Sequence, residues 1–371
     1  MNADADIRLA TRGSDLAMRQ ATTVKSQLSS RRRSVSLVEV ETTGDAIQDE
    51  LIHRLGKTGA FVRSLDEKVL AGELEAAVHS MKDMPTEMPA DLVVAGVPER
   101  APSGDVLVSP DGIALEKLSA EAVVGTSSLR RKAQLLAARP DLEVVPLRGN
   151  VDTRLEKLLA PTLQAEHERL LEADEENAHN PDEWFDSLSA LERSAMERHV
   201  ETEMDAIVLA EAGLRRSGLF ERVETTRLPK SSFVPSPGQG AIAITASSPQ
   251  TVETIRETVD HPRTRVETTV ERTVLAEVGG GCIAPIGVSA ILQGEYVQTR
   301  AQILSHDGTE VIEATRDLPV ADHATAAADF AADLRERGAA ELITEARERS
   351  ETENTTTEGG GAETVMGDED V

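Results

Sequence analysis

The only cysteine of the chain, Cys282, lies in a loop where it could serve as a covalent attachment point. Residues 278–287 read Val-Gly-Gly-Gly-Cys-Ile-Ala-Pro-Ile-Gly. A lone thiol cannot form an intrachain disulfide, and the glycines before it allow positive φ and the close approach of a ligand. This setting favours a thiol that carries a group. The alternative is an inert core thiol, because free cysteines are often buried and react only with a lowered pKa and access.

Three arginine-bearing turns each follow a predicted strand, and together they suit an anionic ligand. They read Ala-Thr-Arg-Gly-Ser at 10–14, Gly-Thr-Ser-Ser-Leu-Arg-Arg at 125–131 and Arg-Gly-Asn-Val-Asp-Thr-Arg at 148–154. In open α/β sheets, ligands bind at the carboxyl ends of the strands, where helix N-termini offer free N–H groups. Arginine binds a carboxylate through two parallel hydrogen bonds. We therefore expect a ligand with several carboxylates or phosphates, although any single arginine could instead form a surface ion pair.

The segment His79-Ser80-Met81-Lys82-Asp83-Met84-Pro85 follows another predicted strand, at 76–79. Asp83 could move a proton or stabilise a developing cation at the same sheet edge, and Lys82 beside it would keep the carboxyl group ionised. His79 lies within the apolar strand, so we expect a hydrogen-bonded core histidine rather than a base.

Strands that alternate with helices must position these turns, and they predict parallel sheets with right-handed crossovers. The predicted strands span 6–10, 35–41, 76–79, 92–97, 106–109, 122–124, 144–147 and 206–210, and the helices 14–29, 61–71, 129–138 and 152–159. Residues 98–104 and 229–240 are predicted crossovers between domains, the second returning to the first domain. A helix at 263–277, strands near 286–293, 296–304 and 310–315, and a helix at 322–347 predict a smaller α+β unit.

The composition limits the class of protein. The chain has 371 residues, enough for two or three domains, and its net charge of -27 argues against a nucleic-acid binder. The 31 arginines far outnumber the 8 lysines, and an acidic surface with few lysines resembles cytoplasmic proteins of salt-loving organisms. An acidic mesophilic protein is the alternative. We expect a cytoplasmic protein, because the chain shows no signal peptide, no membrane-spanning run and no disulfide potential.

Six motifs, in order along the chain, resemble those of the porphobilinogen deaminases (hydroxymethylbilane synthases). They are Arg12 with Ser14, HSMKDMP at 79–85, GTSSLRR at 125–131, RGNVDTR at 148–154, PGQGA at 237–241 and GGGCIAPIG at 279–287. The resemblance implies an α/β protein of three domains. Two are doubly wound domains that resemble type II periplasmic binding proteins, and the third is a smaller α+β C-terminal domain.

The expected domain boundaries follow from this resemblance. Domain 1 takes residues 5–98 and 240–259, domain 2 takes 104–232, and domain 3 takes 260–347 with the attachment loop at 279–287. Domain 2 includes an acidic insert at 161–204 that has no expected counterpart in the family and is predicted to form a solvated helical hairpin. The acidic tail 351–371 is predicted to be disordered.

The resemblance also implies a reaction and its residues. A dipyrromethane cofactor is expected as a thioether on Cys282. Four porphobilinogen molecules would condense onto it with loss of ammonia, before hydrolysis releases hydroxymethylbilane for tetrapyrrole and haem biosynthesis. Asp83 matches the family's catalytic position. The matching cofactor-binding positions are Lys82, Thr126, Ser128, Arg130, Arg131, Arg148 and Arg154, and the substrate-binding ones are Arg12, Ser14, Phe61, Arg148, Arg154 and Arg216. The family implies no metal, no membrane and a monomer.

Two further functions fit part of the pattern. A binding or sensor protein for a carboxylate-rich ligand on the same bilobal scaffold would keep the arginines but would need neither Asp83 nor a glycine-flanked thiol. A thiol acyltransferase would use Cys282 as nucleophile, but no histidine lies near it in sequence. Lys57 is displaced by about one residue from the family's lid motif, which leaves its role open.

Overall fold

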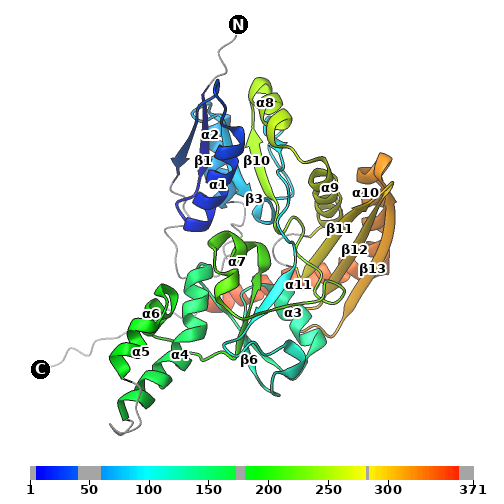
Figure 1. The fold of residues 1–371 in the computed structure, drawn as a ribbon. Coiled ribbons are helices and arrows are strands. Elements are labelled where there is room, and N and C mark those ends of the chain that lie inside the picture. Colours follow the sequence, from blue (N-terminus) through cyan, green and yellow to red (C-terminus); the bar gives the residue numbers. More distant parts are fainter. Residues whose placement is uncertain (1–5, 41–59, 173–179, 281–283, 359–371) are drawn as a thin grey trace, which may run out of the picture.

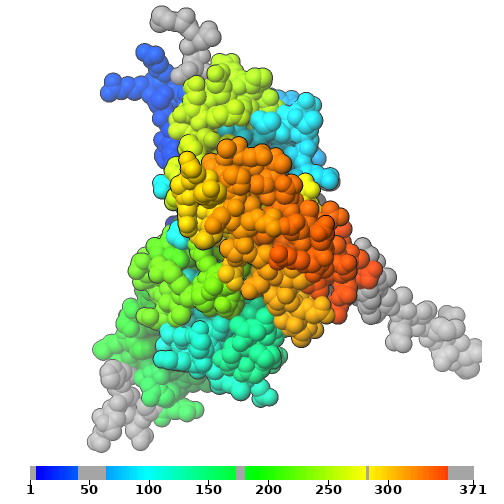
Figure 2. Space-filling view, turned by 90° about the vertical axis from the view of Figure 1, so that its right-hand side faces the viewer, coloured from blue at the N-terminus to red at the C-terminus, as the bar shows by residue number. Residues whose placement is uncertain are grey.

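The computed structural model describes residues 6–40, 60–172, 180–280 and 284–358, without the side chains of 60–63 and 350–358. The chain forms three β-sheets with their helices, and the first two lie one above the other with the third beside them (Figure 1). Figure 2 shows the third unit, in orange, lying against both of the others. Among the described residues, no helix combines the length and the hydropathy that a membrane crossing needs.

The first sheet has the strand order β2-β1-β3-β10-β4. Its strands are β1 (Ile7–Thr11), β2 (Val35–Glu39), β3 (Ala76–Ser80), β4 (Val93–Gly96) and β10 (Ile242–Ala246). β1 is parallel to β2 and β3, whereas β10 is antiparallel to β3 and β4. Helices α1 (Asp15–Leu28) and α8 (Pro249–Val259) cover one face and α2 (Ala60–Leu70) the other, since the alternating residues Leu9 and Ala10 belong to different cores.

The second sheet repeats this arrangement with the order β7-β6-β8-β5-β9. Its strands are β5 (Asp105–Val108), β6 (Val123–Gly125), β7 (Glu143–Val145), β8 (Ala206–Ala210) and β9 (Thr225–Arg227). Helix α3 (Leu129–Ala138) packs on one face, and α4 (Val151–Glu172) and α7 (Glu211–Ser217) pack on the other. β10 lies in the first sheet although it follows the second one in sequence, as the second crossover predicts. The predicted doubly wound α/β class is confirmed for both sheets.

The third unit is an antiparallel sheet of β11 (Ile286–Gln293), β12 (Tyr296–Leu304) and β13 (Val311–Pro319). Helices α9 (Pro262–Glu277), α10 (His323–Leu334) and α11 (Ala340–Glu358) accompany it, and its core includes Val270, Val288 and the fully buried Phe330. This is the smaller α+β unit that the sequence predicts.

The structure corrects two predictions at the C-terminal end. The predicted single helix at 322–347 is interrupted by a wider turn at Arg335–Ala339, where Gly338 has φ of 103°, a value that favours glycine. Helix α11 then continues to Glu358, so the prediction that disorder begins at residue 351 is wrong for the first eight residues of the tail. Residues 351–358 contain no proline or glycine to end a helix, and residues 359–371 lie outside the described part.

The acidic insert is helical, as predicted, but it begins inside a longer helix. The predicted helix 152–159 continues as α4 through Pro161 to Glu172, and α5 (Pro181–Ser187) and α6 (Ala190–Met196) follow. α6 packs back on α4. The carboxylate of Glu156 on α4 accepts hydrogen bonds from Ser194 at 2.8 Å and Arg198 at 2.6 Å. These helices project from the second sheet (Figure 1).

Candidate active site

Arg12 and Ser14 lie where β1 ends and α1 begins. The hydroxyl of Ser14 accepts a hydrogen bond from the Ala17 N–H at 3.4 Å and so caps the helix, as its sequence position predicts. Arg12 is half-buried. Both residues predicted to bind substrate therefore lie at the carboxyl edge of the first sheet.

His79 is a core residue, as predicted. It lies on β3 and is 6% exposed, and its Nε2 lies 2.9 Å from Asp66 Oδ1 and 3.1 Å from Thr245 Oγ1. The carboxylate of Asp66 also accepts a hydrogen bond from Thr245 at 2.7 Å. The imidazole is therefore held inside the domain and does not reach the sheet edge.

Lys82 and Asp83 lie in the short 3-10 helix η1 (Met81–Asp83) that follows β3. Asp83 is exposed and Lys82 is half-buried. The charge of Asp83 acts to raise the pKa of Lys82, but burial and the positive charges of Arg131 and Arg154 outweigh it, so the pKa is lowered from its ordinary value. Lys82 of the first unit is thus within electrostatic reach of two arginines of the second.

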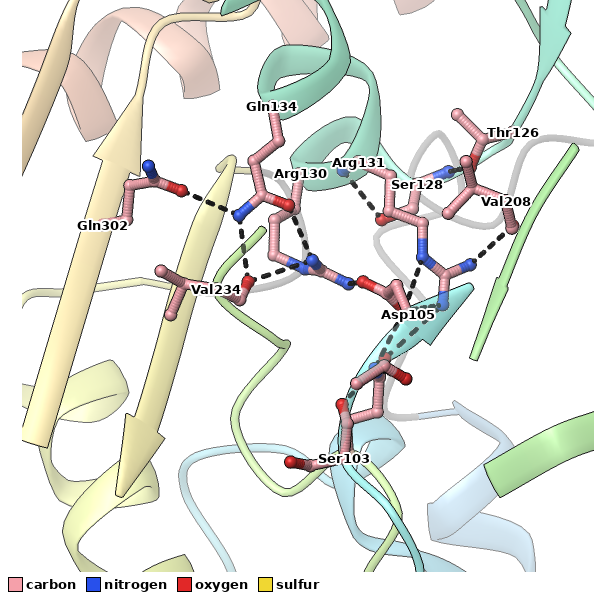
Figure 3. A network of polar contacts seen from close by, with 12 residues as sticks. Ser103, Asp105, Thr126, Ser128, Arg130, Arg131, Gln134, Val208, Val234 and Gln302 are labelled. Carbon is pink, nitrogen blue, oxygen red and sulfur yellow. Dashed lines mark hydrogen bonds and ion pairs between the residues drawn. The ribbon is translucent and has the colours of Figure 1, made fainter. Parts of the chain in front are cut away.

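Arg130 and Arg131, at the start of α3, share the buried carboxylate of Asp105 (Figure 3). Arg130 Nη2 lies 2.9 Å from Asp105 Oδ2, and Arg131 Nη2 lies 2.8 Å from Asp105 Oδ1. Burial alone would raise the pKa of Asp105, but the two guanidinium groups hold it well below its ordinary range. The two arginines carry one positive charge more than this carboxylate neutralises.

Two further predicted cofactor-binding residues, Thr126 and Ser128, shape the turn before α3. Ser128 is the N-cap, and its hydroxyl accepts a hydrogen bond from the Arg131 N–H at 3.4 Å. The Thr126 hydroxyl accepts one from the Ser128 N–H at 3.3 Å (Figure 3). The N-terminus of α3 is therefore built as the sequence predicts, and it adds a positive dipole end to the site.

Arg148 and Arg154 lie around the N-terminus of α4. Arg154 Nε donates a hydrogen bond to the carbonyl oxygen of Gly149 at 2.8 Å, and Gly149 has φ of 113°. Burial and the neighbouring charge of Arg131 lower the pKa of Arg154 to about 10. Arg148 is half-buried and lies three residues after the end of β7. Among the residues that the structure describes, no carboxylate contacts Arg154, so its charge has no acidic partner there.

Arg216 comes from α7 and joins the second sheet to the second crossover. Its Nη2 donates a hydrogen bond to the carbonyl oxygen of Gly240 at 2.6 Å, and burial lowers its pKa. Cys282 and Lys57 lie outside the described residues, as does the side chain of Phe61, which is the second residue of α2.

Asp105 and Gln239 are parts of the site that the sequence prediction did not include. Gln239 is 1% exposed, and its amide donates hydrogen bonds to Ser103 O at 2.6 Å and to Asp105 Oδ1 at 2.9 Å. The sequence does offer one signal for Asp105, because it begins the apolar run Asp105–Val108. An acid in such a run is expected to be buried and to need a positively charged partner. Within the described ranges, no three Asp, Glu, His or Cys side chains form a group that could hold a metal ion.

Two family models match the chain. Residues 7–166 and 190–255 match "Porphobilinogen deaminase, dipyromethane cofactor binding domain", and residues 266–336 match "Porphobilinogen deaminase, C-terminal domain". Within the range of the first model, the unmatched segment is 167–189, which lies inside the predicted insert 161–204. The first part of that region continues α4, and α6 packs against it.

Curated relatives agree with the family models. The chain is 51% identical over 388 residues to a probable porphobilinogen deaminase of the halophile Halobacterium salinarum, covering 92% of this chain and 98% of the relative. It is 39% identical over 346 residues to the porphobilinogen deaminase of Desulforudis audaxviator, with 92% and 98% covered. Among solved structures, the ectoine-binding protein of the TeaABC TRAP transporter matches with a TM-score of 0.33 and 13% identity, covering 68% of this chain and 75% of that one.

Proposed function

The chain belongs to the porphobilinogen deaminase family, and we propose that Asp83, Lys82 and the arginines around them form its active site. It is a transferase of tetrapyrrole biosynthesis that condenses four porphobilinogen molecules head to tail, with loss of ammonia, on a dipyrromethane primer. Hydrolysis then releases hydroxymethylbilane.

The observation that carries the site proposal is the meeting of charges from two units around Lys82. Lys82 and Asp83 come from the end of β3, whereas Arg131 and Arg154 come from the N-termini of α3 and α4. Every one of these elements presents the carboxyl end of a strand or the positive end of a helix. The result is a site in which these positive charges lie near the exposed carboxylate of Asp83.

The described residues fit the implied cofactor, whose two pyrrole rings carry acetate and propionate side chains. Arg154 is half-buried near the charge of a second arginine, Arg131, which shares the carboxylate of Asp105 with Arg130. Such excess positive charge in a partly buried place is matched by several carboxylates. Lys82, Arg131, Arg148 and Arg154 would hold these carboxylates, and Cys282 would hold the thioether. The bound group supplies the nucleophilic α-carbon of its terminal pyrrole.

Asp83 is the residue to which we assign the chemistry. Departure of ammonia from porphobilinogen leaves positive charge on the substrate pyrrole, and a carboxylate beside the ring stabilises that charge and accepts or returns a proton at the ring nitrogen. Lys82 offsets the charge of Asp83 between substrate turnovers. Arg12, Arg148, Arg154 and Arg216 bind the acetate and propionate groups of the incoming substrate, with Ser14 and Phe61 completing the predicted substrate site.

Turnover of Asp83→Ala tests this assignment against the sensor alternative. We expect turnover to fall by at least about a hundredfold. The near-ultraviolet circular dichroism spectrum, which reports tertiary packing, and the covalently bound primer should stay unchanged. Asp91→Ala is the matched control, because Asp91 is also an exposed carboxylate in a turn of the first unit. Equal turnover in the two variants would exclude Asp83 as the catalytic residue.

The intact mass of the purified chain under denaturing conditions, followed by peptide mapping across Cys282, tests the attachment site. We expect an excess equal to a linked two-pyrrole unit on that peptide, and its loss in Cys282→Ser. A primer still bound by a stable thioether in Cys282→Ser would refute the attachment site. The domain boundaries, the monomeric state, the cytoplasmic location and the absence of nucleic-acid binding stay predictions.

A further inference from the structure

A cavity lies between α9 and the segment that follows β3. It has a volume of about 250 Å³, and its lining includes Met81 and Thr86 from the first unit and Arg272 from α9. None of the predicted catalytic, cofactor-binding or substrate-binding residues lines it. Figure 1 shows α9 between the first sheet and the third, so the cavity is at the joint between these units.

Arg272 brings a positive charge to this cavity. Its guanidinium donates hydrogen bonds to the carbonyl oxygens of Met81 and Met84, both at 3.4 Å, and of Pro85 at 2.6 Å. Within the described part of the chain, no carboxylate contacts Arg272, and burial lowers its pKa. Carbonyl dipoles compensate a buried charge only partly, so the site retains a demand for an anion.

The other arginine of the lining shows the contrast. Arg265 Nε lies 2.7 Å from Asp260 Oδ2, and its Nη2 donates to the carbonyl oxygens of Val94 and Ala95 at 3.2 Å. Arg265 is therefore neutralised within the protein. Arg272, seven residues further along the same face of α9, lacks an equivalent partner among the described residues.

Two threonine hydroxyls lie beside Arg272 on the cavity face of α9. Thr269 and Thr273 are separated by one helical turn, and both are half-buried. Among the residues that the structure describes, neither hydroxyl has a hydrogen-bond partner, whereas the neighbouring Thr268 hydroxyl donates to the Thr264 carbonyl oxygen at 2.8 Å. Two unused O–H donors next to an unneutralised guanidinium form the donor set of an anion site.

We propose that this cavity binds one small anion, a halide or a single carboxylate, between Arg272 and the hydroxyls of Thr269 and Thr273. Its volume of about 250 Å³ is smaller than the roughly 300–1,000 Å³ of pockets for larger ligands, so a small anion with water fits it better. Arg272 also holds the carbonyl groups of residues 81–85. Arg272 therefore connects the proposed anion site on α9 to the segment that carries Lys82 and Asp83.

Thermal unfolding of the holoenzyme in sodium bromide and in sodium acetate tests the site in solution. The test variant is Thr269→Val/Thr273→Val, which removes both donors at nearly constant volume, and Thr254→Val on α8 is the control. At an anion concentration about ten times the Kd, we expect the unfolding midpoint of the wild type and of the control to rise about 2 °C more than that of the double variant. Anion binding by the active-site arginines is common to all three proteins and cancels in this difference.

Crystals grown in sodium bromide locate the anion. We expect an anomalous peak within hydrogen-bonding distance of Arg272 and the two threonines, and its loss when acetate replaces bromide. If the unfolding midpoints of the wild type and the double variant differ in acetate but not in bromide, the site binds a carboxylate. If they differ in bromide but not in acetate, the site binds a halide. Equal midpoint shifts in all three proteins, together with a cavity free of bromide in the wild-type crystal, would overturn the proposal. If the double variant does not fold, wild-type crystals grown in bromide and in acetate decide, and a cavity that holds neither anion would overturn the proposal.

Discussion

Glu271 of α9 is the residue whose replacement should most weaken the joint between the three units. Its side chain is 0% exposed. Oε1 accepts hydrogen bonds from Arg100 Nη1 at 2.8 Å and from the Ala290 N–H at 2.9 Å, and Oε2 accepts from Arg100 Nη2 at 2.9 Å and from the Gly238 N–H at 2.8 Å. These partners belong to the first crossover, to β11 and to the second crossover, so one carboxylate connects all three.

Glu271→Gln keeps the shape of the side chain but replaces one oxygen by an NH₂ group. That NH₂ must face N–H donors, and the buried guanidinium of Arg100 loses its counter-charge. Breaking a buried ion pair by removing one partner costs about 3–5 kcal/mol. With an unfolding entropy of about 2.1 cal/mol/K per residue, a chain of 371 residues has about 0.8 kcal/mol/K, so the midpoint should fall by about 4–6 °C.

Differential scanning calorimetry in a fixed high-salt buffer measures this change. Glu277→Gln is the control, because Glu277 lies on the same helix and is exposed, and its midpoint should move by less than about 1 °C. Arg100→Met combined with Glu271→Gln should lose less than the sum of the single changes, since both act on one ion pair. A fall of less than about 1 °C for Glu271→Gln would refute the argument that this carboxylate holds the joint together.

Three other predictions follow from charges and backbone geometry. Asp105→Asn should destabilise the fold at neutral pH. Because the folded pKa of Asp105 lies below its unfolded value, the stability difference from the wild type should shrink as the pH falls below about 4, and urea unfolding at several pH values measures it. Arg154→Gln should raise KM for porphobilinogen. Its unfolding midpoint should stay constant or rise, because burial disfavours the charged form of Arg154 at every pH below its pKa of about 10, and a lower midpoint would contradict this. Gly338→Ala should destabilise the chain by about 1–2 kcal/mol, because φ of 103° is unfavourable for any residue with a Cβ, and Gly294→Ala in the β11–β12 hairpin, at φ of 62°, should cost less.

Local sequence signals predicted most of the elements. The bounds of α3, β8, β11 and β12 agree with the predicted ranges, and Ser14 caps its helix, because caps and hydrophobic alternation act over a few residues. The same locality explains the errors. An isolated glycine is tolerated inside a helical pattern, so Gly338 did not mark the kink, and Pro161 lies inside α4, which packs on α6.

The sequence by itself determined which residues could bind a polyanion and in what order they occur, since residue type decides charge and hydrogen-bonding capacity. Only the tertiary structure decided how those charges are used. Arg130 and Arg131 lie 25 and 26 residues from Asp105, and Arg100 lies 171 residues from Glu271, so no local pattern could pair them. Burial made the difference, because a charge removed from water must find a partner in the fold, as Asp105 does in Arg130 and Arg131 and Glu271 does in Arg100.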